Sequence, residues 1–152
     1  MIIRKANLDT DALSIHEGAM AFAKFTGLPF FPESGTDFIR AVGRIITLPN
    51  VEVFVADDNG VVGGIGISYG PFTWNPEVLI GEELFWWAFE DAPVKTGKKL
   101  YDMAMKSIEE KGAVPVMKYL WNSPESVKKL YEKDGFNEVE TVVMKWRQYQ
   151  QH

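Results

Sequence analysis

The stretch VEVFVADDNGVVGGIGISYG, residues 51–70, constrains the fold more than any other part of this sequence. β-branched residues alternate along it on both sides of Asp58-Asn59-Gly60, a triplet typical of a tight turn between antiparallel strands. The stretch therefore predicts a β-hairpin. Apolar segments elsewhere in the chain must then cover the faces of the sheet to which this hairpin belongs.

The segments around the hairpin predict further strands and helices. A short strand is expected at 2–5, and apolar side chains at three- and four-residue spacing predict helices over about 10–25 and 37–46. PFTWNPEV (71–78) is interpreted as a connection, and LIGEELFWWAF (79–89) as a central strand that is apolar on both faces. The remaining expected elements are a helix over about 97–110, a strand at 113–121, a helix capped by Ser123 with Pro124 at its first position and ended by Asp134-Gly135, and two short strands within 136–146.

The predicted order of elements is β-α-α-β-β-β-α-β-α-β-β. It indicates a single α/β domain over residues 1–152, with a mixed central sheet of six or seven strands. A chain of 152 residues is long enough to bury one core, and a second domain is not needed.

Composition excludes several classes of function. The net charge of −5 argues against nucleic-acid binding, which needs clustered lysine and arginine, and favours a cationic or amine-bearing partner. Because the sequence has no cysteine, it predicts no disulfide and no thiol nucleophile, and the two histidines, His16 and His152, make no metal cluster. The longest apolar run, residues 84–89, is far too short to cross a membrane. We therefore expect a soluble, cytoplasmic protein without a metal.

Two stretches, VFVADDNGVVGGIGI and SPESVKKLYEKDGFNEVETVVMKW, resemble the GCN5-related N-acetyltransferases, the GNAT superfamily. The resemblance implies a mostly antiparallel sheet flanked by four helices, and transfer of an acetyl group from acetyl-CoA to a primary amine of a small molecule or protein. It further implies that the strands at 82–89 and 114–120 are parallel and splayed, so that the pantetheine arm enters between them. The phrase EELFWW also resembles phage-encoded members.

The segment EDAPVKTGKKL, residues 90–100, departs from the family's cofactor motif, R/Q-x-x-G-x-G/A. Placing Gly97 on the final glycine puts Ala92 where arginine or glutamine is expected and Lys95 on the first glycine. We expect Lys95, Thr96, Gly97 and Lys98 to receive a pyrophosphate weakly, with Thr96 offering an N–H and a hydroxyl and the lysines adding positive charge. The alternative interpretation is a helix start whose lysines point to water.

Two residues are candidates for catalysis by resemblance. Glu83 corresponds to a general base, and burial beside aromatic neighbours would raise its pKa toward neutrality. Glu82 competes for the role, since alternation sends the two to opposite faces, and a solvated Glu83 is the other option. Tyr131 corresponds to the general acid that protonates the departing thiolate, and it is otherwise a core tyrosine.

The remaining assignments also depend on the family. The backbone of Trp87 and Ala88 would run beside the pantetheine arm, while Asn122 is either a turn or capping residue or a CoA contact. Two hypotheses for function stay open: an N-acetyltransferase, and a catalytically inactive GNAT-fold module that binds or builds a virus or regulatory complex. A homodimer is kept as an option, because the sequence does not determine the oligomeric state.

Overall fold

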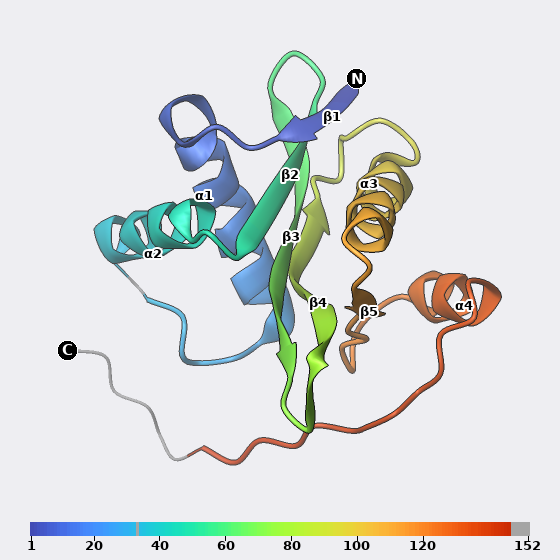
Figure 1. The fold of residues 1–152 in the computed structure, drawn as a ribbon. Helices are drawn as coiled ribbons and strands as arrows, with labels where there is room; N and C mark the ends of the chain where they lie inside the picture. The colour runs from blue at the N-terminus through green and yellow to red at the C-terminus, as the bar shows by residue number, and fades with distance from the viewer. Residues whose placement is uncertain (33, 147–152) are drawn as a thin grey trace.

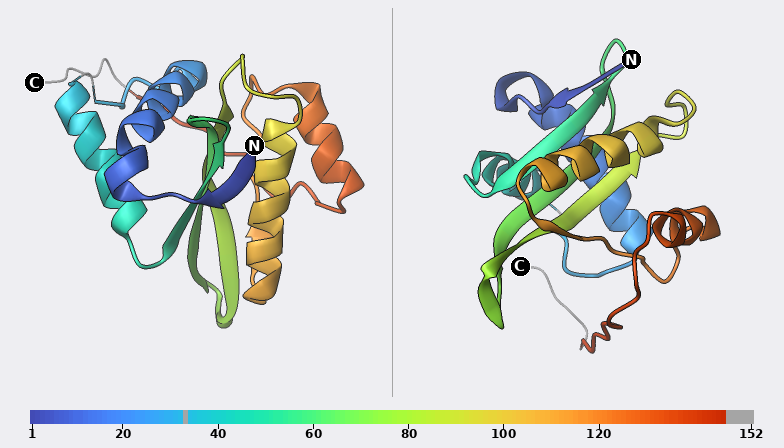
Figure 2. Two further views of the ribbon diagram at one scale, coloured as in Figure 1. Left: turned by 90° about the horizontal axis from the view of Figure 1, so that it is seen from above. Right: turned by 45° about the vertical axis from the view of Figure 1, so that its right-hand side comes forward.

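The computed structural model describes residues 1–32 and 34–146. Its elements are β1 (Ile2–Lys5), α1 (Leu8–Thr26), α2 (Gly35–Thr47), β2 (Val51–Asp57), β3 (Val61–Phe72), β4 (Asn75–Ala88), α3 (Thr96–Glu110), β5 (Val114–Val116) and α4 (Glu125–Lys133). The strands form one sheet in the order β1-β2-β3-β4-β5, antiparallel except that β5 is parallel to β4. Helices α1 and α2 cover one face and α3 covers the other (Figures 1 and 2). The mixed, mostly antiparallel α/β fold predicted from the sequence is confirmed.

The β2–β3 hairpin forms where the sequence predicted it. Asn59 and Gly60 both adopt positive φ angles, 57° and 133°, and the Asp57 carboxylate accepts the Gly60 N–H at 3.0 Å. Asparagine and glycine tolerate this backbone conformation better than other residues, so the turn is placed where these two residues fall.

A second hairpin replaces the connection expected at 71–78. β3 continues to Phe72 and β4 begins at Asn75, which leaves Thr73 and Trp74 as the turn. Pro71 is accommodated because β2 ends opposite Ser68, so the missing N–H of Pro71 breaks no hydrogen bond of the β2–β3 ladder.

The two strands expected within 136–146 do not form. The sheet accordingly has five strands among the described residues rather than six or seven. Val139, Val142 and Val143 are exposed, and the segment runs away from the outer edge of β5 (Figure 1). Alternation indicates which side of a strand would be buried, but a strand also needs a neighbouring edge, and a sequence pattern alone does not specify one.

Helix α4 also begins differently from the expectation. Pro124 is its N-cap and Glu125 its first residue, whereas Ser123 was expected to cap the helix with Pro124 inside it. The Ser123 hydroxyl instead accepts the N–H of Leu120 at 2.9 Å. A serine side chain can satisfy a nearby turn as readily as a helix end, and here the turn before α4 takes it.

A β-bulge in β4 decides which side chains face each layer of helices. Glu83 pairs with Ile67 and Phe85 with Gly66, so Leu84 is an extra residue in β4. Upstream, Gly81 lies against α3, whereas downstream Phe85 packs with the α1–α2 cluster. The bulge therefore reverses the alternation within the strand, which the sequence pattern did not reveal.

Gly18 allows α1 to approach the sheet closely. A Cβ atom at this position would overlap the indole ring of Trp87, which lies buried between Gly18 and Gly64. The glycine thus provides the space that a tryptophan ring needs under the helix.

Gly18→Ala is expected to lower the free energy of unfolding by about 1–3 kcal/mol, because the added methyl group overpacks the Trp87 site. Gly43→Ala on α2 is the control: its Cβ would lie 3.8 Å from Leu8, an ordinary contact, and alanine favours a helix by about 1 kcal/mol over glycine. Chemical denaturation measures both variants. Equal stabilities for the two would contradict the packing argument.

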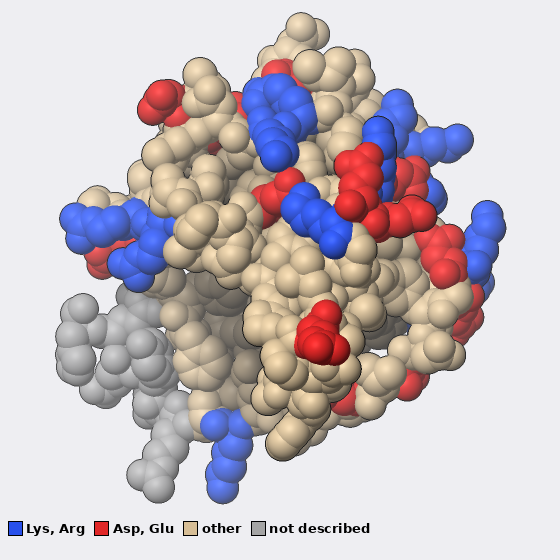
Figure 3. Space-filling model, viewed as in Figure 1, with Lys and Arg blue, Asp and Glu red and all other residues tan. Residues whose placement is uncertain are grey.

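Within residues 1–32 and 34–146, none of the helices combines the length and the apolar character needed to cross a bilayer. Lys and Arg side chains are interspersed with Asp and Glu on the face shown in Figure 3, and they gather into no continuous basic patch there.

Candidate active site

Strands β4 and β5 separate after a short parallel pairing. Their register runs only from Ile80 opposite Val114 to Glu82 opposite Val116, whereas β4 continues to Ala88. The predicted parallel arrangement is confirmed, and in the part of the chain that the structure describes no strand pairs with this side of β4 beyond Glu82. The backbone of Trp87 and Ala88 therefore lies on a free strand edge.

β5 itself is shorter than expected, since it ends at Val116 rather than continuing to residue 121. The chain beyond Val116 leads through a loop into α4 (Figure 1), and we call the region between this loop and β4 beyond Glu82 the wedge.

Glu83 is buried at the point where the two strands separate. Its exposed fraction is only 6%, whereas Glu82 faces the opposite side and is exposed, with its carboxylate 3.5 Å from the Lys118 ammonium. Burial raises the pKa of Glu83 to about 7, against a backbone hydrogen bond from Lys118, the Lys118 charge and the Tyr131 hydroxyl, which lower it. A carboxyl group with a pKa near neutrality can exchange a proton at physiological pH.

Tyr131 reaches Glu83 from α4, forty-eight positions along the sequence. Its hydroxyl donates to the Lys118 carbonyl oxygen at 3.0 Å and lies 3.5 Å from the Glu83 carboxylate. Burial, followed by the charge of Glu83, raises the pKa of Tyr131 above its usual value, so the hydroxyl stays protonated. The structure thus brings the two candidate catalytic residues together beside the Lys118 backbone.

The loop that leads into α3 differs from the family's cofactor motif at Ala92 and Lys95. Lys95, the N-cap, has a φ of 72°, in the left-handed region that favours glycine. This is the position that aligned with the first glycine of the family motif, and a lysine here adopts a backbone conformation that favours glycine. Gly97 follows, and its carbonyl oxygen accepts the Trp86 indole N–H at 3.1 Å.

Thr96 does not offer its polar groups as we expected. Its N–H and its hydroxyl both donate to the Pro93 carbonyl oxygen, at 3.1 and 2.6 Å, and the residue is buried. Both donors are used within the loop, which folds back through Pro93. Among the described backbone carbonyls none accepts the N–H of Gly97 or Lys98, which leaves these two donors at the helix N-terminus.

The charge at this end of α3 is partly neutralised. Lys98 forms an ion pair with Asp102 one turn along the helix, and its ammonium lies 5.6 Å from the centre of the Tyr101 ring. Lys95 and Lys99 are exposed.

Trp87 and Asn122 have structural partners. The Trp87 side chain packs under α1, so only its backbone is available at the wedge. The Asn122 side-chain amide donates to the Phe25 carbonyl oxygen at 2.5 Å and joins the loop before α4 to the end of α1.

Tyr101 and Asp134 are contacts of this site that sequence reasoning missed. The Tyr101 hydroxyl donates to the Asp134 carboxylate at 2.6 Å, and the Tyr101 ring stacks on Trp86 and contacts Tyr131. The spacing of Tyr101, Ala104 and Ile108 places Tyr101 on the inner face of α3, so periodicity could have indicated its burial but not its partner.

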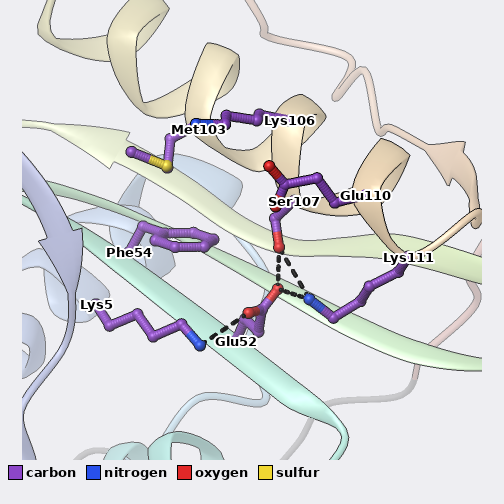
Figure 4. A pocket seen from close by; sticks show the side chains of 8 residues that line it. All are labelled: Lys5, Glu52, Phe54, Met103, Lys106, Ser107, Glu110 and Lys111. Atoms are coloured by element: carbon purple, nitrogen blue, oxygen red, sulfur yellow. Dashed lines mark hydrogen bonds and ion pairs between the residues drawn. The ribbon is translucent and has the colours of Figure 1, made fainter.

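A polar cluster lies at the other end of α3, around a hollow of about 210 Å³ (Figure 4). Burial alone would raise the pKa of Glu52, but hydrogen bonds from Ser107, Lys111, Tyr69 and Lys5 lower it to about 2. Figure 4 shows Ser107 and Lys111 of α3 and Lys5 of β1 converging on the carboxylate. The Glu52 carboxylate already accepts hydrogen bonds from all of these side chains. The cluster therefore connects β2 to α3, and it is not part of the wedge.

A second hollow of about 210 Å³ lies beside Glu82, on the face of the sheet opposite α3. Residues of β3, β4 and the turn between them line it: Ser68, Gly70, Pro71, Phe72, Thr73, Ile80 and Glu82. No three His, Asp or Glu side chains among the described residues are placed to hold a metal ion together.

No family model and no curated protein sequence matches this chain. Solved structures do match along nearly its whole length. A ribosomal-protein-alanine N-acetyltransferase from Brucella melitensis biovar Abortus 2308 superposes with a TM-score of 0.71 at 17% identity, covering 97% of this chain and 99% of that one. A predicted acetyltransferase from Clostridium acetobutylicum with acetyl-CoA has a TM-score of 0.70 at 11% identity and 94% coverage of both chains.

An aminoglycoside acetyltransferase from an uncultured soil metagenomic sample, in complex with sisomicin, has a TM-score of 0.71 at 16% identity and covers 97% of this chain and 96% of that one. This chain has the GNAT fold. At identities of 11–17%, the likeness to these structures is one of fold.

Proposed function

We propose that this protein is an N-acetyltransferase that transfers an acetyl group from acetyl-CoA to a primary amine. The observation that carries the proposal is the buried Glu83 carboxyl, with a pKa of about 7, beside the Tyr131 hydroxyl where β4 and β5 separate. The solved structures with this fold support it, because they include acetyltransferases named for an alanine of a ribosomal protein and for aminoglycosides. The acceptor here is an amine of a small molecule or a protein.

In this proposal Glu83 accepts a proton from the acceptor ammonium, and Tyr131 donates a proton to the leaving thiolate. The Glu83 carboxylate takes a proton from the acceptor ammonium, directly or through water, and the freed amine nitrogen forms a bond to the acetyl carbonyl carbon. As the carbon–sulfur bond breaks, Tyr131 donates its hydroxyl proton to the departing thiolate, and the second proton that the nitrogen loses on becoming an amide restores the Tyr131 hydroxyl. Proximity of the two groups in a buried site favours both transfers, since neither group needs to be brought in from water.

The residues at the start of α3 fit a pyrophosphate in part. The free N–H groups of Gly97 and Lys98 point from a helix N-terminus, where the helix dipole also favours an anion. Lys95, Lys98 and Lys99 add positive charge. The Thr96 N–H and hydroxyl both donate to the Pro93 carbonyl oxygen, so these two donors are not available to a phosphate. Binding through this loop is therefore weak and largely electrostatic.

The free edge of β4 supplies the other half of a cofactor site. Backbone groups of Trp87 and Ala88 on this edge are suited to hold an amide-bearing chain such as the pantetheine arm, as an added strand would be held.

A second candidate function is a GNAT-fold module without catalysis, which binds or builds a complex. The specific observation in its favour is the loop at residues 92–97, where Ala92 and Lys95 replace motif residues and Thr96 is turned inward.

Calorimetry with acetyl-CoA at low and high salt separates the two candidates. For the enzyme we expect measurable affinity that falls as salt is added, because lysine charges carry much of the interaction. Lys98→Glu is expected to weaken it on the order of tenfold, the loss of one charged contact. Lys106→Glu changes the net charge equally but lies further along α3, and its affinity should match the wild type. An absence of binding at millimolar acetyl-CoA and low salt would favour the non-catalytic module.

A further inference from the structure

Helix α4 carries Tyr131 but lies apart from the rest of the fold. Within residues 1–32 and 34–146, its backbone lies against none of the other helices or strands, and Figure 1 shows it standing to one side of α3 and the sheet. The chain enters it from the loop 117–124 and leaves it through the segment 136–146, which is exposed after Phe136. The position of the Tyr131 hydroxyl therefore depends on a few side-chain contacts rather than on helix packing.

One of these contacts is the hydrogen bond from the Tyr101 hydroxyl to the Asp134 carboxylate, at 2.6 Å. Tyr101 is 1% exposed, and its ring is held by stacking on Trp86, whose indole N–H donates to the Gly97 carbonyl oxygen. Tyr101 is thus a fixed point on α3. Burial raises the pKa of the Tyr101 hydroxyl, which keeps it protonated as a donor.

Asp134 is an unfavourable residue for the end of a helix. It is the C-cap of α4, where the helix dipole disfavours a negative charge. The hydrogen bond from Tyr101 explains why an aspartate occupies this position, since a carboxylate is a stronger acceptor for the tyrosine hydroxyl than a neutral group would be. The bond fixes the C-terminal end of α4 to α3, three residues beyond Tyr131.

We propose that Tyr101 and Asp134 are positioning residues for the acetyl transfer: their hydrogen bond holds α4 so that the Tyr131 hydroxyl stays beside Glu83. This inference rests on the proposed function for its catalytic part. The ring contact between Tyr101 and Tyr131, with centroids 6.2 Å apart, lets the fixed point on α3 act on Tyr131 directly as well as through the helix end.

The kinetic test is Tyr101→Phe, which removes only the hydroxyl. It is expected to lower kcat about tenfold and leave the KM for acetyl-CoA within about twofold, because Tyr101 acts on the proton donor and not on the cofactor loop. Tyr69→Phe is the matched control: its hydroxyl donates to Glu52 at the far end of α3, so the same atom is lost away from Tyr131. Asp134→Ala should reproduce the Tyr101→Phe effect, and the double variant should be no slower than either single one.

The decisive arm combines Tyr101→Phe with Tyr131→Phe. If Tyr101 acts through Tyr131, adding Tyr101→Phe to the Tyr131→Phe protein changes kcat by less than about twofold. A merely structural role would multiply the two defects instead, and that result would overturn the proposal.

Amide hydrogen exchange over 125–133 tests the structural part without any substrate. Exchange in α4 should be on the order of tenfold faster in Tyr101→Phe than in Tyr69→Phe. Equal exchange in the two variants would overturn the proposal. If the wild-type protein transfers no acetyl group to any amine, the proposed function and the catalytic role of Tyr101 both fail, and the exchange measurement alone decides whether the bond holds α4.

Discussion

Glu83→Gln is expected to lower kcat by roughly 10²–10⁴-fold, the usual contribution of a general base. The affinity for acetyl-CoA should be unchanged, because the contacts proposed for acetyl-CoA are the backbone of Trp87 and Ala88 and the start of α3, and not the Glu83 side chain. Glutamine keeps the shape of the side chain and one accepting oxygen but cannot take up the ammonium proton. The measurement is initial velocity against a panel of amines, with calorimetry for acetyl-CoA.

The pH profile of the wild-type protein should carry the signature of the same group. Only the ionised carboxylate acts as a base, and the pKa of Glu83 is raised to about 7. Below about pH 7, kcat/KM should therefore fall about tenfold per pH unit, and above it this limb should level off. Deprotonation of the acceptor amine would give a second limb of the pH profile. Changing the amine would shift that limb with the amine's own pKa, whereas the limb from Glu83 would stay in place. Glu83→Gln should abolish the limb near 7.

Glu82→Gln is the matched control for both measurements. Glu82 is the adjacent carboxylate, but it faces the opposite side of β4 and is exposed. Its variant should keep the limb near pH 7 and most of kcat. A loss of activity in Glu82→Gln equal to that in Glu83→Gln would contradict the assignment of the base.

Tyr131→Phe is the second large effect, with kcat expected to fall by a comparable 10²–10⁴-fold because thiolate departure loses its proton donor. Since the pKa of Tyr131 is raised, the wild-type profile should show no loss of this acid at moderately alkaline pH. Rapid measurement of thiol release checks the rate, and acetyl-CoA binding should stay as in the wild type.

Tyr119→Phe is the control for this variant. Tyr119 is exposed, and its hydroxyl donates to the Ser123 carbonyl oxygen in the same loop region. Normal turnover in both tyrosine variants on a confirmed substrate would remove Tyr131 from the mechanism.

The parts of the fold that the sequence predicted correctly are those set by local chemistry. The hairpin at Asn59 follows from residues that tolerate positive φ angles, and the helices follow from apolar spacing. Glu83 stood out because a carboxylate in an apolar strand needs a reason to be there, and Tyr131 because of the signature around it. Their meeting across the wedge agrees with the resemblance, although their roles remain predictions.

The parts that the sequence did not predict depend on contacts between distant segments. Thr96 turns inward because Pro93 folds back over the helix start, and the two strands expected within 136–146 pair with no edge of the described sheet. The bond between Tyr101 and Asp134 joins two helices whose relative position no local pattern encodes. Propensity and periodicity describe single elements, whereas these features arise from tertiary contacts.

The extra residue at Leu84 makes β4 behave as two short strands joined end to end, each with its own rule for which positions face inward. In the first half, odd-numbered residues such as Gly81 and Glu83 face the α3 side of the sheet. In the second half, the even-numbered Trp86 faces that side. Substitutions that tune reactivity at Glu83 are thereby separated from those that tune packing at Phe85 and Trp87 under α1. Deletion of Leu84 would remove the bulge and restore one regular alternation along β4. Either Glu83, or Phe85 and Trp87, would then have to move to the opposite face of the sheet.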